Sequence, residues 1–252
     1  MKNLKIENGV KVFVTITILL VLFLYFKERE INYNPTPYEK EIIDYFKEIA
    51  LQSEYDDNSQ RVIKWKKPML LYVVKEKELK SQMSVIKKVI NEINELATDG
   101  FEIKLTDNLL TSNSVLYLCE KDRVRELDRE FYELLTDDID YEIAGLAYSE
   151  YFAATYIIDR SFIFVSTEEE FNVQESTILE EITQSLGLAF DSKKYANSIF
   201  YKDKSEQKIR TSEYSRLDRD IVRLLYHPEM EPGLDSIELT TVIKKIFKSE
   251  KD

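Results

Sequence analysis

The residues with the clearest capacity for chemistry lie in one segment, 175–192, which reads ESTILEEITQSLGLAFDS. Glu180 and Gln184 are spaced i, i+4, so a helix places both side chains on one face, with Glu181 beside them. Asp191 follows shortly afterwards. Carboxylate and amide oxygens in this arrangement could hold a hard cation such as Ca²⁺ or Mg²⁺, and a glutamate could act as a general base toward water. The segment is therefore a candidate site.

The pattern around these residues predicts how they are positioned. Thr177 opens a T-x-x-E capping box, which predicts that a helix begins there. Ile178, Ile182 and Leu186 share the opposite face of that helix and are expected to be buried. Gly187 can supply the left-handed residue that ends the helix.

The segment resembles the active-site helix of the metzincin zinc peptidases, H-E-x-x-H-x-x-G-x-x-H/D. The frame is occupied here by Glu180, Glu181, Gln184, Gly187, Phe190 and Asp191. A metzincin holds zinc with three imidazoles, or two and a carboxylate, whereas this chain contains a single histidine, His227. We therefore expect no zinc site and no cofactor, and any oxygen-only metal site would polarise water less.

Three interpretations of this helix stay open at the level of sequence. The glutamates could form a solvated helix face with a structural role. The helix could instead line a protein-binding cleft inherited from a peptidase, with Glu180, Glu181, Gln184, Gly187, Phe190 and Asp191 as the cleft residues. Finally, hydrolase chemistry could survive, with Glu181 as the general base near a hard metal or a water molecule.

Hydrophobic periodicity predicts the elements that surround this helix. Helices are expected over 37–55, 80–98 and 122–136, and strands over 61–74, 101–105, 114–119, 141–152 and 154–167. Together with the resemblance, this order implies one α+β domain of the zincin type, in which helices back a mixed sheet and the degenerate active-site helix lies under a cleft. The strand near 154–165 is expected to be the sheet edge that borders the cleft and could pair with a partner strand.

The C-terminal third is expected to be helical. "SRLDRDIVRLLYHP" predicts a helix whose end is capped by His227 through the helix dipole. Aromatic residues of the two β-rich runs are expected to be strand core and cross-strand pairs. They are Tyr148, Tyr151, Phe152, Tyr156, Phe162 and Phe164.

An apolar run, VFVTITILLVLFLYF over 12–26, approaches the length of a transmembrane helix. Three lysines precede it, whereas the charges that follow it cancel, so the positive-inside rule keeps the N-terminus in the cytoplasm. The sequence thus predicts a cytoplasmic tail (1–11), a signal anchor (12–27), a linker (28–38) and a periplasmic or extracellular domain (39–252). A cleaved signal peptide and a buried soluble helix are the alternatives.

Charge limits the classes of partner. The whole chain carries a formal net charge of −12, and residues 31–252, with 30 basic and 44 acidic residues, carry −14. Such a field repels phosphate backbones and anionic lipid heads, so we expect no nucleic-acid partner. No glycine-rich phosphate loop occurs, which argues against nucleotides. A cationic protein or peptide of the cell envelope is the expected partner, and the single cysteine allows no intrachain disulfide.

A second resemblance covers most of the chain. The segments DYFKEIALQSEY, IKWKKPMLLYV, EEITQSLGLAFDS, NSIF and LDRDIVRLLYHPEMEPGL resemble the bacterial family catalogued as domain of unknown function 2927, from about residue 40 to 235. Members of that family are mostly predicted envelope proteins and lipoproteins without an established activity. The uncleaved anchor expected here departs from the lipoprotein members.

These observations favour a membrane-anchored extracytoplasmic protein whose catalytically inactive, peptidase-like domain serves as a protein-binding or assembly module. A divergent hydrolase or peptidase that uses Glu181 as general base is one alternative. The other is a membrane signalling or adaptor subunit in which the transmembrane segment is the working part.

Overall fold

The computed structural model describes residues 33–52, 60–75, 78–136, 143–202 and 211–251. The predicted tail and anchor, and residues 28–32 of the predicted linker, lie outside the described residues. Among the helices that are described, none combines the length and the hydropathy needed to span a bilayer.

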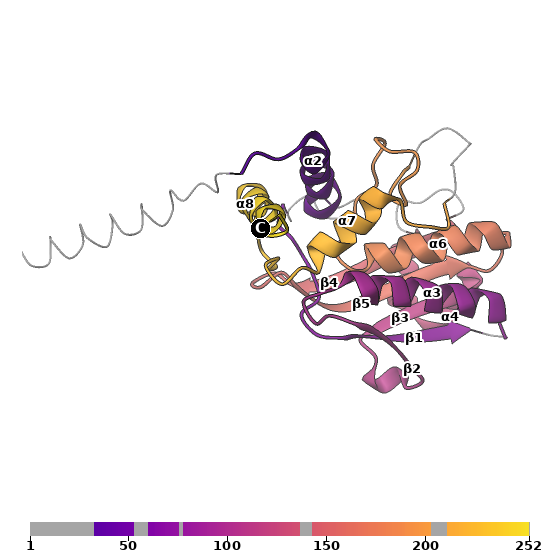
Figure 1. Cartoon of the computed structure of the whole chain (residues 1–252). Helices are drawn as coiled ribbons and strands as arrows, with labels where there is room; N and C mark the ends of the chain where they lie inside the picture. Colours follow the sequence, from indigo (N-terminus) through magenta and orange to yellow (C-terminus); the bar gives the residue numbers. More distant parts are fainter. Residues whose placement is uncertain (1–32, 53–59, 76–77, 137–142, 203–210, 252) are drawn as a thin grey trace, which may run out of the picture.

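One five-stranded sheet forms the centre of the molecule, with the strand order β2-β1-β3-β5-β4 (Figure 1). The strands are β1 (Met69–Lys75), β2 (Ile103–Thr106), β3 (Ser114–Cys119), β4 (Gly145–Phe152) and β5 (Ile157–Ser166). The pairs β1–β2, β1–β3 and β3–β5 are parallel, and only β4 runs antiparallel to its neighbour β5. The expected mixed sheet backed by helices is confirmed, although the sheet is mostly parallel.

The predicted edge strand near 154–165 is wrong. β5 lies inside the sheet, since it pairs with β3 on one side and β4 on the other. The physical reason is the hairpin: β4 and β5 are joined by a short turn, and the parallel pairing of β5 with β3 leaves β4 at the edge. The strand predicted over 61–74 is also shorter, because Pro68 lacks an N–H group and the sheet strand begins after it.

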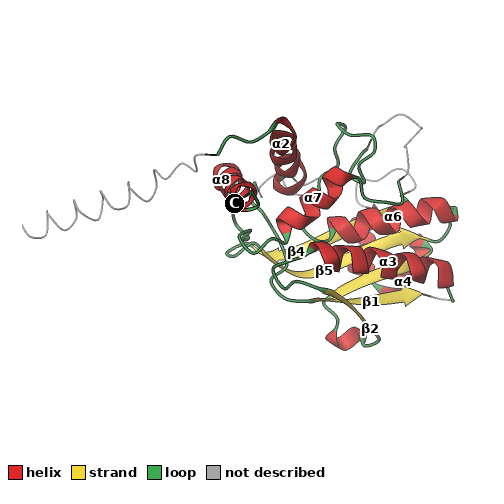
Figure 2. Ribbon diagram, in the orientation of Figure 1, coloured by secondary structure: helices red, strands yellow, loops and turns green. Residues whose placement is uncertain are grey.

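Helices cover both faces of the sheet (Figure 2). They are α2 (Pro37–Leu51), α3 (Lys80–Leu96), α4 (Lys121–Leu127), α5 (Arg129–Thr136), α6 (Phe171–Gln184), α7 (Arg216–Leu225) and α8 (Ser236–Ser249), with a 3-10 turn, η1 (Leu109–Thr111), between β2 and β3. Leu116 and Leu118 of β3 face the core shared by α2, α3, α6, α7 and α8, whereas Tyr117 and Cys119 face the smaller core under α4 and α5. This alternation follows from the two-residue period of a strand.

Buried polar groups tie the C-terminal helices to the segment after α6. Asp218 of α7 accepts hydrogen bonds from the Ser198 hydroxyl at 2.5 Å and from the Ser215 and Ile199 amides at 2.9 and 3.2 Å. Tyr45 of α2 donates to the same Ser198 hydroxyl at 2.8 Å. Burial raises the pKa of Asp218, and these hydrogen bonds oppose the rise. These hydrogen bonds join α2, the segment at residues 198–199 and the start of α7.

Candidate functional site

Helix α6 carries the predicted site residues and is enclosed on nearly all sides. Every residue from Val173 to Thr183 except Glu175 is buried. The predicted start at Thr177 is wrong: the helix begins at Phe171, and the Gln174 amide, which donates to the Glu169 oxygen at 2.6 Å, fastens its first turns. Thr177 therefore lies within the helix rather than capping it.

The acidic pair on α6 is not a solvated helix face. Glu180 is 9% and Glu181 is 6% exposed. The interpretation as a solvated face is wrong, because α6 packs against β4 and β5 of the sheet and against α3, and both side chains are buried. Two adjacent carboxyl groups in a buried position carry a desolvation cost that a surface pair does not, so their environment bears on function as well as on stability.

The edge strand β4 runs against the side of α6 that carries Glu181. Gly145 begins β4, and a β-carbon there would overlap Thr177 and lie 2.9 Å from the Glu181 side chain. Further along, the Ser149 hydroxyl donates to the Ser185 main-chain oxygen at 3.3 Å. The predicted closeness of a sheet edge to this helix is therefore present, although a different strand provides the edge.

The turn after α6 is fixed by three contacts. Gly187 has φ +108°, as expected for the left-handed residue at the helix end, and a β-carbon there would overlap the Ile63 main-chain oxygen. The Trp65 indole N–H donates to the Ser185 oxygen at 3.0 Å. The Tyr226 hydroxyl donates to the Leu186 oxygen at 3.0 Å. The position of the frame glycine is thus determined by residues far from it in the sequence.

The remaining frame residues are bonded to one another instead of converging on a cavity. The Gln184 amide nitrogen donates to Asp191 Oδ1 at 2.8 Å. The other Asp191 oxygen, Oδ2, lies 2.9 Å from the Lys202 ammonium group. Phe190, next to Asp191, is half-buried. Both carboxylate oxygens of Asp191 therefore have a partner. The Gln184 side chain directs its N–H donor at Asp191 and not its acceptor oxygen.

Metal binding has little geometric basis at this place. Over the described ranges, no three His, Cys, Asp or Glu residues lie close enough together to hold a metal ion. A hard cation would need carbonyl or carboxylate oxygens in place of the Gln184 N–H that points at Asp191.

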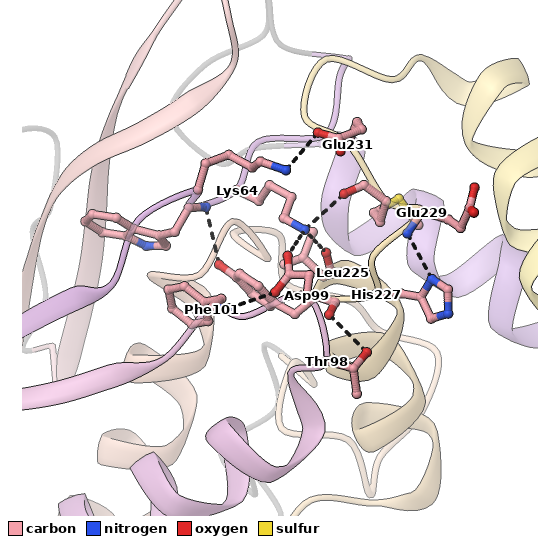
Figure 3. Close-up of polar contacts among 12 residues, drawn as sticks. Lys64, Thr98, Asp99, Phe101, Leu225, His227, Glu229 and Glu231 are labelled. Atoms are coloured by element: carbon pink, nitrogen blue, oxygen red, sulfur yellow. Dashed lines mark hydrogen bonds and ion pairs between the residues drawn. The ribbon is translucent and has the colours of Figure 1, made fainter.

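A buried lysine that the sequence analysis missed, Lys64, lies beside Asp99 and Leu225 (Figure 3). The Lys64 ammonium group is fully buried and donates to Asp99 Oδ2 at 2.7 Å, the Leu225 oxygen at 2.7 Å and the Met230 oxygen at 3.0 Å. It also lies 4.8 Å from the centre of the Tyr226 ring. Burial lowers the pKa of Lys64, and the bond to Asp99 opposes this. Lys64 neutralises the C-terminal end of α7, where main-chain oxygens lack helical partners.

The predicted cap of α7 by His227 is therefore corrected. The His227 Nδ1 atom accepts a hydrogen bond from the Glu229 amide at 3.1 Å, so this nitrogen carries no proton. Burial also lowers the pKa of His227, which disfavours the cation that a dipole cap requires. Lys64 provides that positive charge instead. The one signal in the sequence was the placement of Lys64 two residues after Val62, on the inward face of an alternating run.

The aromatic residues of the hairpin divide into two groups. Tyr148 and Phe162 are cross-strand neighbours and Phe164 is fully buried, as predicted. Phe152, however, is 57% exposed at the end of β4, so its assignment to the core is wrong. Phe152 is still a cross-strand neighbour of Ile157 at the end of the hairpin.

Fold and site together define an α/β protein in which an acidic buried helix lies against an antiparallel edge strand. The sequence profile of the family described as "Protein of unknown function (DUF2927)" matches residues 39–245, and the chain belongs to this family. No curated protein matches the chain in sequence.

Proposed function

We propose that this protein is a membrane-anchored binding module whose zincin-like domain receives an extended segment of a partner protein along the edge strand β4. The observation that carries the proposal is the open edge of β4 beside α6. The antiparallel ladder with β5 uses the main-chain groups of alternate residues, beginning with the Ala144 oxygen, which accepts from Ser166. The main-chain groups of Gly145, Ala147 and Ser149 consequently face away from β5 and, within the described ranges, have no hydrogen-bond partner.

The opposite edge of the sheet supports this choice by contrast. At β2, the Asn94 side chain accepts from the Ile103 N–H at 2.7 Å and donates to the Ile103 oxygen at 3.0 Å. One amide thus occupies both outward groups of that residue, which is a way of protecting an edge strand from pairing. Strand addition needs a row of available main-chain groups, and β4 offers it where β2 does not.

The side chains at the ligand positions of the frame support a binding function without catalysis. The frame that resembles a metzincin holds Gln184 and Asp191 at ligand positions, and these two side chains bond to each other. The mixed sheet with one antiparallel edge strand beside the frame helix supports a zincin-like relationship. The anchor and the extracytoplasmic location are supported by the apolar run at 12–26 and the lysines before it.

A photoreactive residue on β4 tests the proposal in the full-length chain in its own membranes. Placed at the exposed Glu150, it should form an adduct with another protein, and Ala147→Pro should abolish that adduct because proline removes an outward N–H without breaking the β5 ladder. Ala147→Ser, which keeps the N–H, is the matched control and should retain the adduct. Equal adduct yields from Ala147→Pro and Ala147→Ser would contradict strand addition.

A divergent hydrolase is the second candidate, and one observation favours it. Glu181, at the base position of the frame, is buried beside the first residue of the proposed binding strand. A partner segment on β4 would therefore pass close to a carboxyl group. The Glu181→Gln substitution separates the two functions, because it removes a general base but leaves the β4 edge unchanged.

A further inference from the structure

Three leucines are exposed within six residues, one in β2 and two in the η1 turn that connects β2 to β3. The exposed fractions are 39% for Leu105, 52% for Leu109 and 95% for Leu110. Asp107 lies between them, is exposed, and has no ion-pair partner within the described part of the chain. Single exposed leucines are common, but three of them within six residues favour an interaction surface. We call Leu105, Asp107, Leu109 and Leu110 the leucine tip.

The leucine tip is held in shape by its own polar residues. Asn108 Oδ1 accepts from the Leu110 amide at 3.0 Å, and the Ser112 hydroxyl donates to the Leu109 oxygen at 2.8 Å. At the base, Asn113 accepts from the Leu70 amide at 2.6 Å and donates to the Pro68 oxygen at 2.9 Å. The leucines are therefore presented in a fixed conformation, and a partner that covers them loses little free energy to ordering the loop.

The position of the leucine tip in the domain argues against its binding to a lipid surface. Tyr33, the first described residue, is fixed beside Glu39 and Lys251, and in Figure 1 this end lies across the molecule from the β2–β3 connection. The proposed anchor precedes Tyr33 in the sequence, so it joins the domain at this end and not at the leucine tip. Loops that bind lipid also carry basic residues, whereas Lys104 pairs with Glu102 and Asp107 is acidic.

We propose that the leucine tip docks into an apolar pocket of a second extracytoplasmic protein that has a lysine or arginine at the rim to pair with Asp107. The location of this partner rests on the proposed extracytoplasmic function, but the docking surface does not depend on β4. β2 and β4 are the two opposite edges of the sheet. The domain then has two separate binding surfaces and joins two proteins.

The test uses the full-length chain in its native membranes with a photoreactive residue in place of Leu110. A discrete adduct with one other protein is expected. Leu109→Asn should lower its yield about 30-fold, the effect of losing one central interface side chain, whereas Leu134→Asn, at a leucine of α5 with the same 39% exposure as Leu105, should leave it unchanged. Both substitutions are at the surface, so equal thermal unfolding temperatures serve as the folding control.

The second arm of the test measures how much the charge of Asp107 contributes to binding. It uses the partner protein identified from the adduct, after that partner has been purified. Asp107→Asn should weaken binding and reduce its dependence on salt, whereas the matched exposed Asp122→Asn should do neither. A lipid adduct, an adduct of two copies of this chain, no adduct, or equal effects of Leu109→Asn and Leu134→Asn would each overturn the proposal. Ala147→Pro should leave the position-110 adduct intact, so failure of the β4 proposal is distinguishable from failure of this one.

Discussion

The carboxamide nitrogen of Gln184 lies 2.8 Å from Asp191 Oδ1. In a zinc peptidase frame both positions would direct electron pairs at a metal, whereas here one side chain donates to the other. The second Asp191 oxygen is bound by Lys202. Gln184, Asp191 and Lys202 therefore form a hydrogen-bonded triplet that fastens the chain that leaves α6.

This geometry predicts that the purified protein contains no stoichiometric zinc. Tetrahedral zinc sites in proteins are built mainly from histidine and cysteine ligands, with carboxylates as additional ligands. The chain offers one histidine, whose Nδ1 accepts a main-chain hydrogen bond. Elemental analysis of protein prepared without chelator measures the content. One zinc per chain that disappears in Glu180→Ala would contradict the prediction.

Gly187→Ala is expected to destabilise the fold by about 2–4 kcal/mol, from an unfavourable positive φ and an overlap with the Ile63 oxygen. Gly100→Ala is the matched control, because Gly100 has φ +92° but no atom within 4 Å of an added β-carbon. It should cost only about 1 kcal/mol, the conformational part. Urea unfolding of both variants gives the difference, and equal losses would mean that the contact with Ile63 does not matter.

Lys64→Met is expected to cost about 3–5 kcal/mol, because it leaves Asp99 and two main-chain oxygens at the end of α7 without their donor. Lys66→Met provides the comparison. The Lys66 pair with Glu231 is exposed and should contribute no more than about 1 kcal/mol. Urea unfolding at one pH measures both variants; similar losses would show that Lys64 is not the centre of a buried network.

Stability should also depend on pH through Glu39 at the start of α2. Burial acts to raise the pKa of Glu39, but hydrogen bonds from Lys251, Thr36 and Tyr33 outweigh it and lower the pKa from 4.5 to about 2. Since the folded pKa is the lower one, ionised Glu39 stabilises the fold above pH 4.5, and this contribution is lost as the pH falls toward 2. Glu39→Gln should therefore be less stable than the natural chain at pH 7, and the difference should shrink toward zero near pH 2. A difference that stays constant with pH would contradict this assignment.

The sequence predicts local structure well, but it predicts poorly which strands are neighbours and which side chains contact each other. The strand at 114–119 coincides with β3, and Gly187 takes the left-handed conformation expected of it. The order of β4 and β5 was missed because both runs are apolar and alternating, and strand neighbours are decided by contacts distant in sequence. The burial of Lys64 could not be recognised from the sequence, because lysines are usually exposed. Its three hydrogen-bond acceptors belong to residues distant from it in the sequence, Asp99, Leu225 and Met230.

Substitution of Glu181 distinguishes most clearly between a binding function and a catalytic function. Its side chain is 6% exposed and lies next to Gly145 at the start of the edge strand. A general base contributes about 10²–10⁴ in rate, whereas one charged hydrogen bond at a binding surface contributes about 1.5–3 kcal/mol. We expect Glu181→Gln, which keeps the size of the side chain and one acceptor oxygen, to preserve the β4 adduct and the biological activity measured by complementation of a deletion strain.

Glu180→Gln serves as the control for the cost of changing a buried carboxyl group on the same helix, and equal unfolding temperatures establish that both variants fold. If Glu181→Gln retains membrane insertion and the β4 adduct but loses complementation, while Glu180→Gln retains all three, partner binding alone does not account for the function. That result would favour the hydrolase, because a change from carboxylate to carboxamide removes the capacity to accept a proton while leaving the shape of the site intact.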